Sequence, residues 1–440
     1  MANIRTIVKK FIPTSLFGAV EPFGHLLESV AMNVKYGFPS RGMHIIGVTG
    51  TNGKTTTSFM IHKMLVEAGK KTGLMTTVAY GVNDDITPQV AHMTTASAGL
   101  LQKRLRDFKR AGVEWVVLET TSHALAQHRV WGIDYEIAVM TNITHEHLDY
   151  HKTFARYLAA KVRLFKIASK HGKRTGIINA DDPNANAFNE VIPHAVLYGL
   201  KDGDLKATKI HMGADGSRFK ATIGKDSYDI QCNIPGEFNV YNSLAAVATG
   251  RVVGLTTKQI EDGIKALKGV EGRMTVVNAG QDFTVIVDFA HTPDSFERLL
   301  SDLRASTKGR LITLFGSAGR RDETKRAIQG EIAGKYSDEV ILTEEDDRDV
   351  DGNKILQQIA AGAKKSGKKI DKDLFLILNR EEAIGFALTR AKAAGDTVVL
   401  LGKGHEKTIE RADGTYSWNE IEAATSALEE LTRSGSSKRR

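Results

Sequence analysis

A glycine-rich segment near the N-terminus carries the strongest chemical signal in the sequence. It reads Ile45-Ile-Gly-Val-Thr-Gly-Thr-Asn-Gly-Lys-Thr-Thr-Thr57 and lies between an apolar run and a helical pattern. Glycines let backbone N–H groups approach phosphate oxygens, a lysine adds positive charge, and the hydroxyl of Thr55 can reach a phosphate-bound Mg²⁺ ion. The strict pattern G-x4-G-K-[ST] is not met, because Val48 stands in place of its first glycine. We expect an ATP-binding loop that consists of Gly50, Thr51, Asn52, Gly53, Lys54, Thr55 and Thr56.

A carboxylate, an imidazole and an amine farther along the chain are candidate partners of this loop. Glu119 ends the apolar run Trp115–Glu119, and open α/β sheets bind ligands at the carboxyl ends of their strands. A carboxylate there suits Mg²⁺, although a helix-capping carboxylate has the same sequence pattern. By residue type alone, His147 is more often a satisfied core or surface histidine, and Lys161 is more often a solvated helix lysine.

Short apolar runs alternate with helical patterns through most of the chain, which is typical of parallel α/β sheets. The expected strands are Met43–Thr49, Trp115–Glu119, Tyr135–Asn142, Thr175–Asn179, Thr284–Phe289, Leu311–Phe315, Val340–Thr343, Leu374–Leu378 and Thr397–Leu401. Between the two sets, Lys201–Asp229 is polar and reads as antiparallel strands and turns. We therefore predict an α/β protein with a central domain at residues 41–268 and a C-terminal domain at residues 269–433.

The two ends of the chain differ from the rest. Within residues 1–40, apolar residues recur at helical spacing, which predicts a helix whose apolar face packs on the central domain. These residues are Phe23, Leu26, Leu27, Val30, Ala31 and Val34. Weak contact of this helix with a membrane surface is the alternative. Residues 434–440 are small, polar and basic, and we expect them to be disordered.

The composition excludes several classes of protein. The chain has 440 residues, against about 100–200 for one domain, and 41% apolar and 25% charged residues exclude disordered and collagen-like proteins. A net charge of +8 is a weak argument for nucleic acid and suits an anionic substrate equally. The single cysteine, Cys232, excludes an intrachain disulfide, and the charge-free stretch Phe11–Val20 is too short to span a bilayer. We expect a cytoplasmic monomer or weak oligomer that binds no nucleic acid.

Motifs spread from Gly47 to Glu406 resemble one enzyme family. Thr49-Gly-Thr-Asn-Gly-Lys-Thr-Thr56 resembles the ATP loop of the Mur ligases, which are ATP-dependent amide ligases of peptidoglycan precursor synthesis. Further segments resemble the family in the same order: Glu119-Thr-Thr-Ser-His-Ala-Leu-Ala-Gln-His-Arg129, Thr141-Asn-Ile-Thr-His-Glu-His-Leu-Asp-Tyr-His151, Tyr157-Leu-Ala-Ala-Lys161, Asn179-Ala-Asp-Asp182, Gly236-Glu-Phe-Asn-Val-Tyr-Asn242, Gly272-Arg-Met274, Asp288-Phe-Ala-His-Thr-Pro-Asp294 and Gly402-Lys-Gly-His-Glu406. The set is most similar to the MurE type, the UDP-N-acetylmuramoyl-tripeptide synthetases.

This resemblance implies a central P-loop ATPase domain, with a mostly parallel sheet, and a C-terminal Rossmann-like α/β domain. The implied reaction adds an amino acid to a UDP-MurNAc-dipeptide-type acceptor through an acyl phosphate, with ATP and two Mg²⁺ ions. In the family the lysine that matches Lys161 is carbamylated by CO₂, which converts a cation into an anion with two oxygen ligands. The implied metal ligands are Thr55, Glu119, His147 and Lys161, and the implied catalytic residues are Lys54, Glu119, His147 and Lys161.

The resemblance also assigns binding residues. Those implied for the nucleotide, besides the loop, are Asn239, Asn242, Arg273 and Asp288. Those implied for the muramoyl-peptide acceptor are Thr94, Thr95, Thr121 and Arg129, of which Arg129 best suits an anionic group. Those expected for the amino acid are Glu345, Asp346, Arg348, Gly402 and Glu406.

Two departures from the family pattern leave the substrates open. Only 46 residues precede Gly47, whereas MurE enzymes normally carry a full UDP-binding domain there, so we expect the UDP anchor to be missing or replaced. Where diaminopimelate-adding enzymes have Asp-Asn-Pro-Arg, this chain has Glu345-Asp-Asp-Arg348, which suits either meso-diaminopimelate or a basic amino acid such as L-lysine. A ligase of lipid-linked acceptors, a folylpolyglutamate synthetase and a non-catalytic scaffold are the alternatives.

Overall fold

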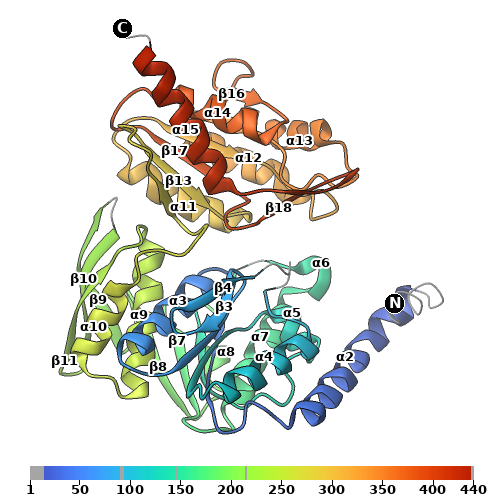
Figure 1. The fold of residues 1–440 in the computed structure, drawn as a ribbon, viewed down its shortest axis with the longest axis vertical. Helices are drawn as coiled ribbons and strands as arrows, with labels where there is room; N and C mark the ends of the chain where they lie inside the picture. Colours follow the sequence, from blue (N-terminus) through green and yellow to red (C-terminus); the bar gives the residue numbers. More distant parts are fainter. Residues whose placement is uncertain (1–13, 90–93, 145, 214–215, 438–440) are drawn as a thin grey trace. The chain divides into compact units, whose positions relative to one another are not determined.

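The computed structural model describes residues 14–89, 94–144, 146–213 and 216–437. The chain divides into two compact units (Figure 1). The first comprises Met1–Ile210, Arg218–Cys232 and Asn239–Leu267, and the second comprises His211–Ser217, Asn233–Phe238 and Lys268–Arg440. Each unit is built around its own sheet.

The described part of the first unit contains an eleven-stranded sheet with the order β11-β10-β9-β8-β7-β6-β1-β5-β2-β3-β4. Its strands are β1 (His44–Thr49), β2 (Thr72–Met75), β3 (Ala79–Val82), β4 (Asp85–Pro88), β5 (Trp115–Glu119), β6 (Tyr135–Met140), β7 (Thr175–Asn179), β8 (His194–Gly199), β9 (Leu205–Gly213), β10 (Gly216–Ile223) and β11 (Asp226–Cys232). β1 pairs in parallel with both β5 and β6, and the parallel pairing extends to β2 and through β7 to β8. The predicted α/β fold is confirmed.

Helices cover both faces of this sheet (Figure 1). They are α2 (Thr14–Tyr36), α3 (Lys54–Glu67), α4 (Ala98–Arg110), α5 (Ser122–Ala126), α6 (Leu148–His151), α7 (Phe154–Ala168), α8 (Ala185–Asn189), α9 (Glu237–Val253) and α10 (Thr257–Ala266). One core joins Leu101 of α4 and Phe165 of α7 to Ile45 of β1 and Val116 of β5. Because successive strand residues face opposite sides, Ile46 and Val117 are left for the other face, where α3 contacts β1 and β5.

The second unit has a six-stranded sheet with the order β12-β13-β17-β14-β15-β16 among its described residues. Its strands are β12 (Thr275–Val277), β13 (Thr284–Asp288), β14 (Leu311–Phe315), β15 (Glu339–Leu342), β16 (Leu374–Leu376) and β17 (Thr397–Leu401), and a separate pair consists of β18 (Thr408–Arg411) and β19 (Gly414–Ser417). All neighbours in the larger sheet are parallel except β12 and β13. The parallel strands β13 to β17 therefore end together at one edge, as in other doubly wound sheets.

The helices of the second unit form two layers. They are α11 (Pro293–Ser306), α12 (Thr324–Tyr336), α13 (Gly352–Lys365), α14 (Arg380–Arg390) and α15 (Glu420–Ser437). Leu388 of α14 and Leu428 of α15 share a buried core with Leu314 of β14. The neighbouring Phe315 faces the other side, where its ring lies 4.8 Å from that of Phe296 in α11.

The N-terminal helix α2 buries a different face from the predicted one. Leu27 and Val34 are 70% and 65% exposed, whereas His25, Ser29 and Asn33 are buried. The hydroxyl of Ser29 donates to the carbonyl of His128 at 2.8 Å, and the amide of Asn33 donates to the carbonyl of Trp131 at 2.7 Å. The expected packing of α2 on the central domain is confirmed by its contacts with α4, and Leu26 and Val30 are half-buried. The predicted face is wrong at Leu27, Ala31 and Val34, because the turn that α2 meets presents carbonyl oxygens, which polar side chains satisfy and apolar ones do not. The side chain of Phe23 lies outside the described residues.

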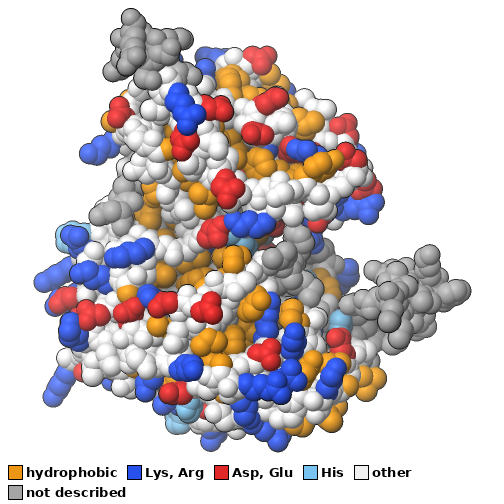
Figure 2. Space-filling view, viewed as in Figure 1, with side chains coloured by type: hydrophobic (Ala, Val, Ile, Leu, Met, Phe, Trp, Pro, Cys, Tyr) orange, Lys and Arg blue, Asp and Glu red, His pale blue; other side chains and the backbone are white. Residues whose placement is uncertain are grey.

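The C-terminal end also differs from the expectation. Residues 434–437, predicted to be disordered, continue helix α15 as far as Ser437, because extending an existing helix is less costly than starting one. Residues 438–440 lie outside the described part of the chain. None of the described helices combines the length and the apolar character that crossing a membrane requires. Figure 2 shows basic and acidic side chains interspersed over the visible face of the first unit.

Candidate functional site

The predicted ATP loop connects β1 to α3 and needs its glycines. Gly50 has φ 150° and Gly53 has φ 80°, both in the region that favours glycine. A Cβ atom on Gly50 would lie 1.8 Å from Oγ1 of Thr141, and one on Gly53 would lie 2.4 Å from Oδ1 of Asn242. The backbone N–H of Asn52 donates to Oδ1 of Asn142 at 2.9 Å, so a neighbouring strand end supports the loop.

A hydroxyl and a carboxylate meet beside this loop. Thr55, in the first turn of α3, donates from Oγ1 to Oε2 of Glu119 at 3.0 Å. Thr77 donates to the same carboxylate oxygen from its N–H at 3.0 Å and from its hydroxyl at 3.1 Å. Glu119 is only 1% exposed. Oxygen ligands of this kind suit Mg²⁺, so the residues present fit the metal that the sequence implies. Lys54, half-buried, donates from Nζ to the carbonyl of Thr51 at 2.7 Å.

Lys161 lies under the same loop. It belongs to α7, is 2% exposed, and donates from Nζ to the carbonyl of Gly50 at 2.5 Å. Burial, together with the positive charge of Lys54, lowers the pKa of the Lys161 amine well below its usual value, although Glu146 and Glu119 oppose that shift. The amine also lies 4.8 Å from the centre of the Tyr157 ring. A buried amine with a lowered pKa is more often unprotonated at neutral pH, and the unprotonated form is the one that reacts with CO₂.

His147 follows β6 and lies at the edge of an aromatic cluster. Its ring centre is 4.6 Å from that of His123 and 6.3 Å from that of Tyr157, and its Nε2 is 3.6 Å from Oε2 of Glu146. In the described residues, no three His, Cys, Asp or Glu side chains are grouped as a metal site.

The residues predicted for the acceptor form one connected group next to Glu119. Oγ1 of Thr95 donates to the carbonyl of Glu119 at 3.0 Å and is 3.1 Å from Oγ1 of Thr121. The Arg129 guanidinium is buried and donates to the carbonyls of Thr95 and Ala96. Thr94 is half-buried beside them. This group shares the strand end that carries the predicted metal ligand.

The residues predicted for the nucleotide fall in both units. In the first, Nδ2 of Asn242 donates to Oδ1 of Asn239 at 2.9 Å, and Oδ1 of Asn242 accepts from the hydroxyl of Thr57 at 3.1 Å, which ties α9 to α3. In the second, Asp288 ends β13 and accepts from the N–H groups of Met274 and Ala290 at 2.7 and 2.8 Å. Burial raises the pKa of Asp288, although the nearby Arg273 opposes the shift.

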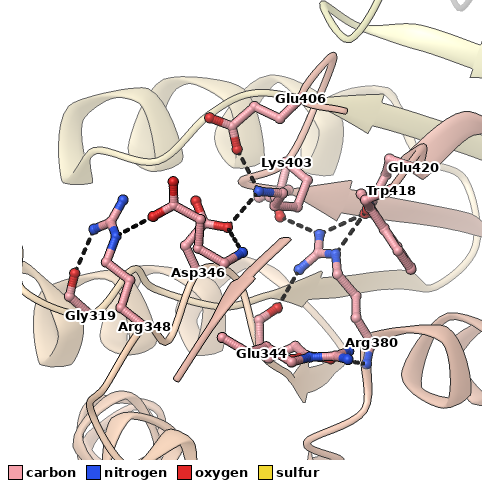
Figure 3. Close-up of polar contacts among 12 residues, drawn as sticks. Gly319, Glu344, Asp346, Arg348, Arg380, Lys403, Glu406, Trp418 and Glu420 are labelled. Carbon is pink, nitrogen blue, oxygen red and sulfur yellow. Dashed lines mark hydrogen bonds and ion pairs between the residues drawn. The ribbon is translucent and has the colours of Figure 1, made fainter. Parts of the chain in front are cut away.

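The residues predicted for the amino acid gather at the carboxyl edge of the second sheet (Figure 3). Nζ of Lys403 lies 2.9 Å from Oδ1 of Asp346 and 2.6 Å from Oε2 of Glu406. Nε of Arg348 donates to Oε2 of Glu410 at 2.7 Å, and its Nη1 donates to the carbonyl of Gly319 at 2.7 Å. A Cβ atom on Gly402 would lie 2.8 Å from Oε2 of Glu345. Three loops thus converge, and both Arg348 and Glu406 are already paired.

Two basic residues that sequence reasoning did not assign contact the segment Glu344–Asp347, which we call the acidic loop. Arg380, fully buried, donates to both carboxylate oxygens of Glu420 at 2.8 and 2.6 Å, and to the carbonyls of Glu344 and Leu401 at 2.9 and 2.8 Å. The sequence could have indicated Lys403, because it lies inside the motif Gly402-Lys-Gly-His-Glu406. No sequence pattern indicated Arg380, because the residues that it contacts are remote in sequence.

Models of known protein families match most of the chain. Two domain models match the chain, the Mur ligase middle domain at residues 48–250 and the Mur ligase, glutamate ligase domain at residues 272–404. The chain belongs to the Mur ligase family. It is an ATP-dependent acid–amino-acid ligase with MurE-type relatives, as the motifs predicted.

Several relatives of this Mur ligase are similar over most of their length. A UDP-N-acetylmuramyl-tripeptide synthetase of Roseiflexus sp. (strain RS-1) is 40% identical over 414 residues, which cover 91% of this chain and 81% of the relative. A UDP-N-acetylmuramoyl-L-alanyl-D-glutamate--2,6-diaminopimelate ligase of Bacillus velezensis is 39% identical and covers 92% and 82%. A solved structure of a ligase of the latter name has 31% identity and a TM-score of 0.63, covering 89% and 79%. A Mycobacterium tuberculosis folylpolyglutamate synthase, at 17% identity, a TM-score of 0.69 and coverage of 87% and 96%, shares the fold alone.

The Thr55–Glu119 contact of this Mur ligase gives a direct test of the metal assignment. Glu119→Gln keeps the shape of the side chain but removes its charge, so we expect turnover to fall by about a hundredfold or more because the site then holds Mg²⁺ poorly. The Mg²⁺ concentration needed for tight nucleotide binding should rise in parallel. Glu114→Gln, at an exposed position just before β5, is the matched control. Wild-type Mg²⁺ dependence in a folded Glu119→Gln enzyme would refute the assignment.

Proposed function

We propose that this Mur ligase adds an amino acid to a UDP-MurNAc-dipeptide acceptor in peptidoglycan precursor synthesis. The observation that carries the proposal is the convergence of Thr55, Glu119 and Lys161 on one ATP loop, next to the Thr95–Thr121–Arg129 group. Relatives that are about 40% identical bear tripeptide-synthetase names, which supports this acceptor. The single cysteine and the use of ATP support a cytoplasmic location.

The chemistry follows from the charges that the chain provides. An acceptor carboxylate oxygen attacks the γ-phosphorus of ATP, ADP leaves, and an acyl phosphate forms; the donor amine then attacks the acyl carbon, loses a proton, and phosphate leaves. Lys54 and the helix N-terminus of α3 bind phosphate oxygens, and Arg129 binds an anionic group of the acceptor. Bound Mg²⁺ would supply charge neutralisation at the transferring phosphoryl group. Thr55, Glu119, His147 and a carbamylated Lys161 are its proposed ligands.

Product analysis tests the proposal. The enzyme is given ATP, Mg²⁺, UDP-MurNAc-L-Ala-D-Glu and a pool of amino acids, and products are analysed by mass spectrometry. We expect one amino acid to be joined to the acceptor with loss of one water, and ADP and phosphate to form in equal amounts. ATP use that requires a lipid-linked acceptor or a folate in place of this acceptor would contradict the proposal.

A further inference from the structure

Helix α2 (Figure 1) exposes apolar side chains and buries polar ones, which reverses the usual pattern of a helix that faces water. Leu27 and Val34 are 70% and 65% exposed, and Ala31 between them is exposed as well. These three residues are spaced by four and three positions, so they form one line along the helix, which we call the α2 stripe. A contiguous exposed apolar surface of this kind indicates a binding face.

Polar bonds on the opposite side of α2 hold the stripe outward. The hydroxyl of Ser29 and the amide of Asn33 donate to the carbonyls of His128 and Trp131. The amide of Asn33 also donates to the carbonyl of Ser29 at 2.9 Å. Turning the stripe inward would break the bonds to His128 and Trp131 and leave buried polar groups without partners. The exposure of the stripe is therefore built into the first unit.

Aromatic rings continue the apolar surface beyond the end of α2. Phe38 follows the helix, and its ring centre lies 6.5 Å from that of Trp131, which is 37% exposed. The guanidinium of Arg41 lies 4.3 Å from the centre of the Phe38 ring. Exposed tryptophan and basic side chains beside apolar ones are typical of proteins that contact the boundary between lipid headgroups and acyl chains.

Basic residues gather around the end of α2. We call them the basic cluster, and they are Lys35, Arg41, Arg106, Lys109 and Arg110. Nζ of Lys109 donates to the carbonyl of Arg41 at 2.8 Å, and the guanidinium of Arg106 lies 4.7 Å from the ring centre of Tyr36, the last residue of α2. Asp107 of α4, 3.7 Å from Arg106, and Glu28 of α2 offset only part of this positive charge.

An anionic lipid surface suits both the stripe and the basic cluster. Its phosphate groups attract the cations, and the boundary between headgroups and acyl chains takes up the apolar side chains. Nucleic acid would meet the cations but offers the stripe no apolar partner. Two copies of the chain joined through the stripe would bring two basic clusters together, and these repel.

The sequence before the stripe has the same sign of charge. Arg5, Lys9 and Lys10 occur there, and no acidic residue precedes Glu21. Attraction to an anionic surface grows with each such basic residue close to it. The charge of this end of the chain therefore favours a lipid surface that carries negative headgroups.

We propose that α2 and the basic cluster dock this ligase reversibly on membranes that contain anionic lipids. The helix lies in the plane of the surface, because the stripe from Leu27 to Val34 is only about 10 Å long. None of the helices in the described part of the chain can cross a bilayer. The inference goes beyond the proposed function, since docking requires neither ATP nor a particular acceptor.

Vesicle flotation of the full-length enzyme tests the docking. Vesicles of phosphatidylcholine alone are compared with vesicles of phosphatidylcholine and phosphatidylglycerol in equal amounts. We expect at least about tenfold stronger binding to the mixed vesicles at low salt, and a loss of this difference at high salt, because salt screens exposed charges. Tryptophan emission should shift to shorter wavelength on binding, and the shift should be absent from Trp131→Phe.

Two substitutions in the stripe test the apolar contribution. Leu27→Gln combined with Val34→Gln should weaken binding to the mixed vesicles by about tenfold or more. Thermal unfolding should stay unchanged, because both side chains are exposed. Ile328→Gln is the matched control, since Ile328 is 48% exposed on α12 of the second unit, and it should bind like the wild-type enzyme.

Two substitutions in the basic cluster test the contribution of charge. Lys35→Gln combined with Arg110→Gln should also weaken binding to the mixed vesicles by about tenfold, and should leave the weak binding to phosphatidylcholine unchanged. The matched control is Lys364→Gln combined with Lys365→Gln, at exposed positions of α13 in the second unit. This control removes the same charge from the whole chain and should retain wild-type binding.

The proposal is wrong if the enzyme does not bind the mixed vesicles, or if the stripe variant and Ile328→Gln weaken binding equally. Binding to a DNA duplex in place of vesicles, dependent on the basic cluster alone, would assign the surface to nucleic acid. Dimerisation in sedimentation experiments that the stripe variant abolishes, without vesicle binding, would assign the stripe to a second copy of the chain. Each of these last two results would also overturn lipid docking.

Discussion

Replacing Lys161 by alanine should lower ligase turnover by about a thousandfold or more. The proposed carbamate forms when the unprotonated amine attacks CO₂, a nitrogen–carbon bond forms, and the amine proton goes to solvent. Burial lowers the pKa of Lys161, which favours this reaction at neutral pH. Lys161→Arg should fail as well, because a guanidinium keeps positive charge where an anion is needed. Steady-state kinetics measures both variants.

The control for this series lies on the same helix. Lys166 is exposed on α7, and Lys166→Ala should leave turnover unchanged. Removing bicarbonate should lower the activity of the wild-type enzyme reversibly, and intact-mass spectra in bicarbonate should show the added CO₂ on the wild-type enzyme and not on Lys161→Ala. Full activity of the Lys161→Arg enzyme, or of wild-type enzyme rigorously freed of CO₂, would show that no carbamate is needed.

Lys54→Ala is expected to lower kcat/KM for ATP by about a thousandfold, which corresponds to roughly 4 kcal/mol of lost transition-state stabilisation. The Lys54 amine donates to the carbonyl of Thr51 at 2.7 Å, within the loop that we propose binds the phosphates. Unfolding free energy should change by less than about 1 kcal/mol, because a half-buried loop lysine contributes little to the folded state.

Measurements of ATP hydrolysis and thermal unfolding test this prediction together. Lys103, exposed on α4, provides the control, and Lys103→Ala should retain wild-type kinetics. Nucleotide affinity should fall in Lys54→Ala but not in the control. If the folded Lys54→Ala enzyme hydrolyses ATP normally in the presence of both substrates, the phosphate-binding role of this lysine is wrong.

The sequence allowed the α/β fold and the glycine-rich loop between β1 and α3 to be predicted because both depend on local patterns. Buried parallel strands are continuous apolar runs, and the close approaches at Gly50 and Gly53 demand glycine within a few residues. Strand ends were less accurate: the run predicted to reach Asn142 ends as β6 at Met140. The strand ends earlier because Asn142 belongs to the following loop, where its side chain accepts a hydrogen bond from the N–H of Asn52 in the ATP loop.

Pairings between remote segments could not be predicted in the same way. The buried face of α2 was predicted wrongly because Ser29 and Asn33 bond to carbonyls about one hundred residues away, at His128 and Trp131. In the second unit, the Arg348–Glu410 pair joins the loop after β15 to strand β18, and no periodic pattern relates these two segments. Residue types in these segments indicated charge recognition, but which charges cancel one another was visible only in three dimensions.

The contacts of Arg380 have a consequence for how the second unit matures. This buried guanidinium donates to the carbonyl of Glu344, just after β15, and to that of Leu401, at the end of β17, and its counter-charge is Glu420 at the start of α15. During synthesis from the N-terminus, Glu344 and Arg380 emerge well before Glu420, and until then a cation without its carboxylate opposes closure of this edge. We therefore expect the acidic loop to reach its final form only after α15 has been made, so that a ribosome-bound chain lacking α15 leaves this loop unformed.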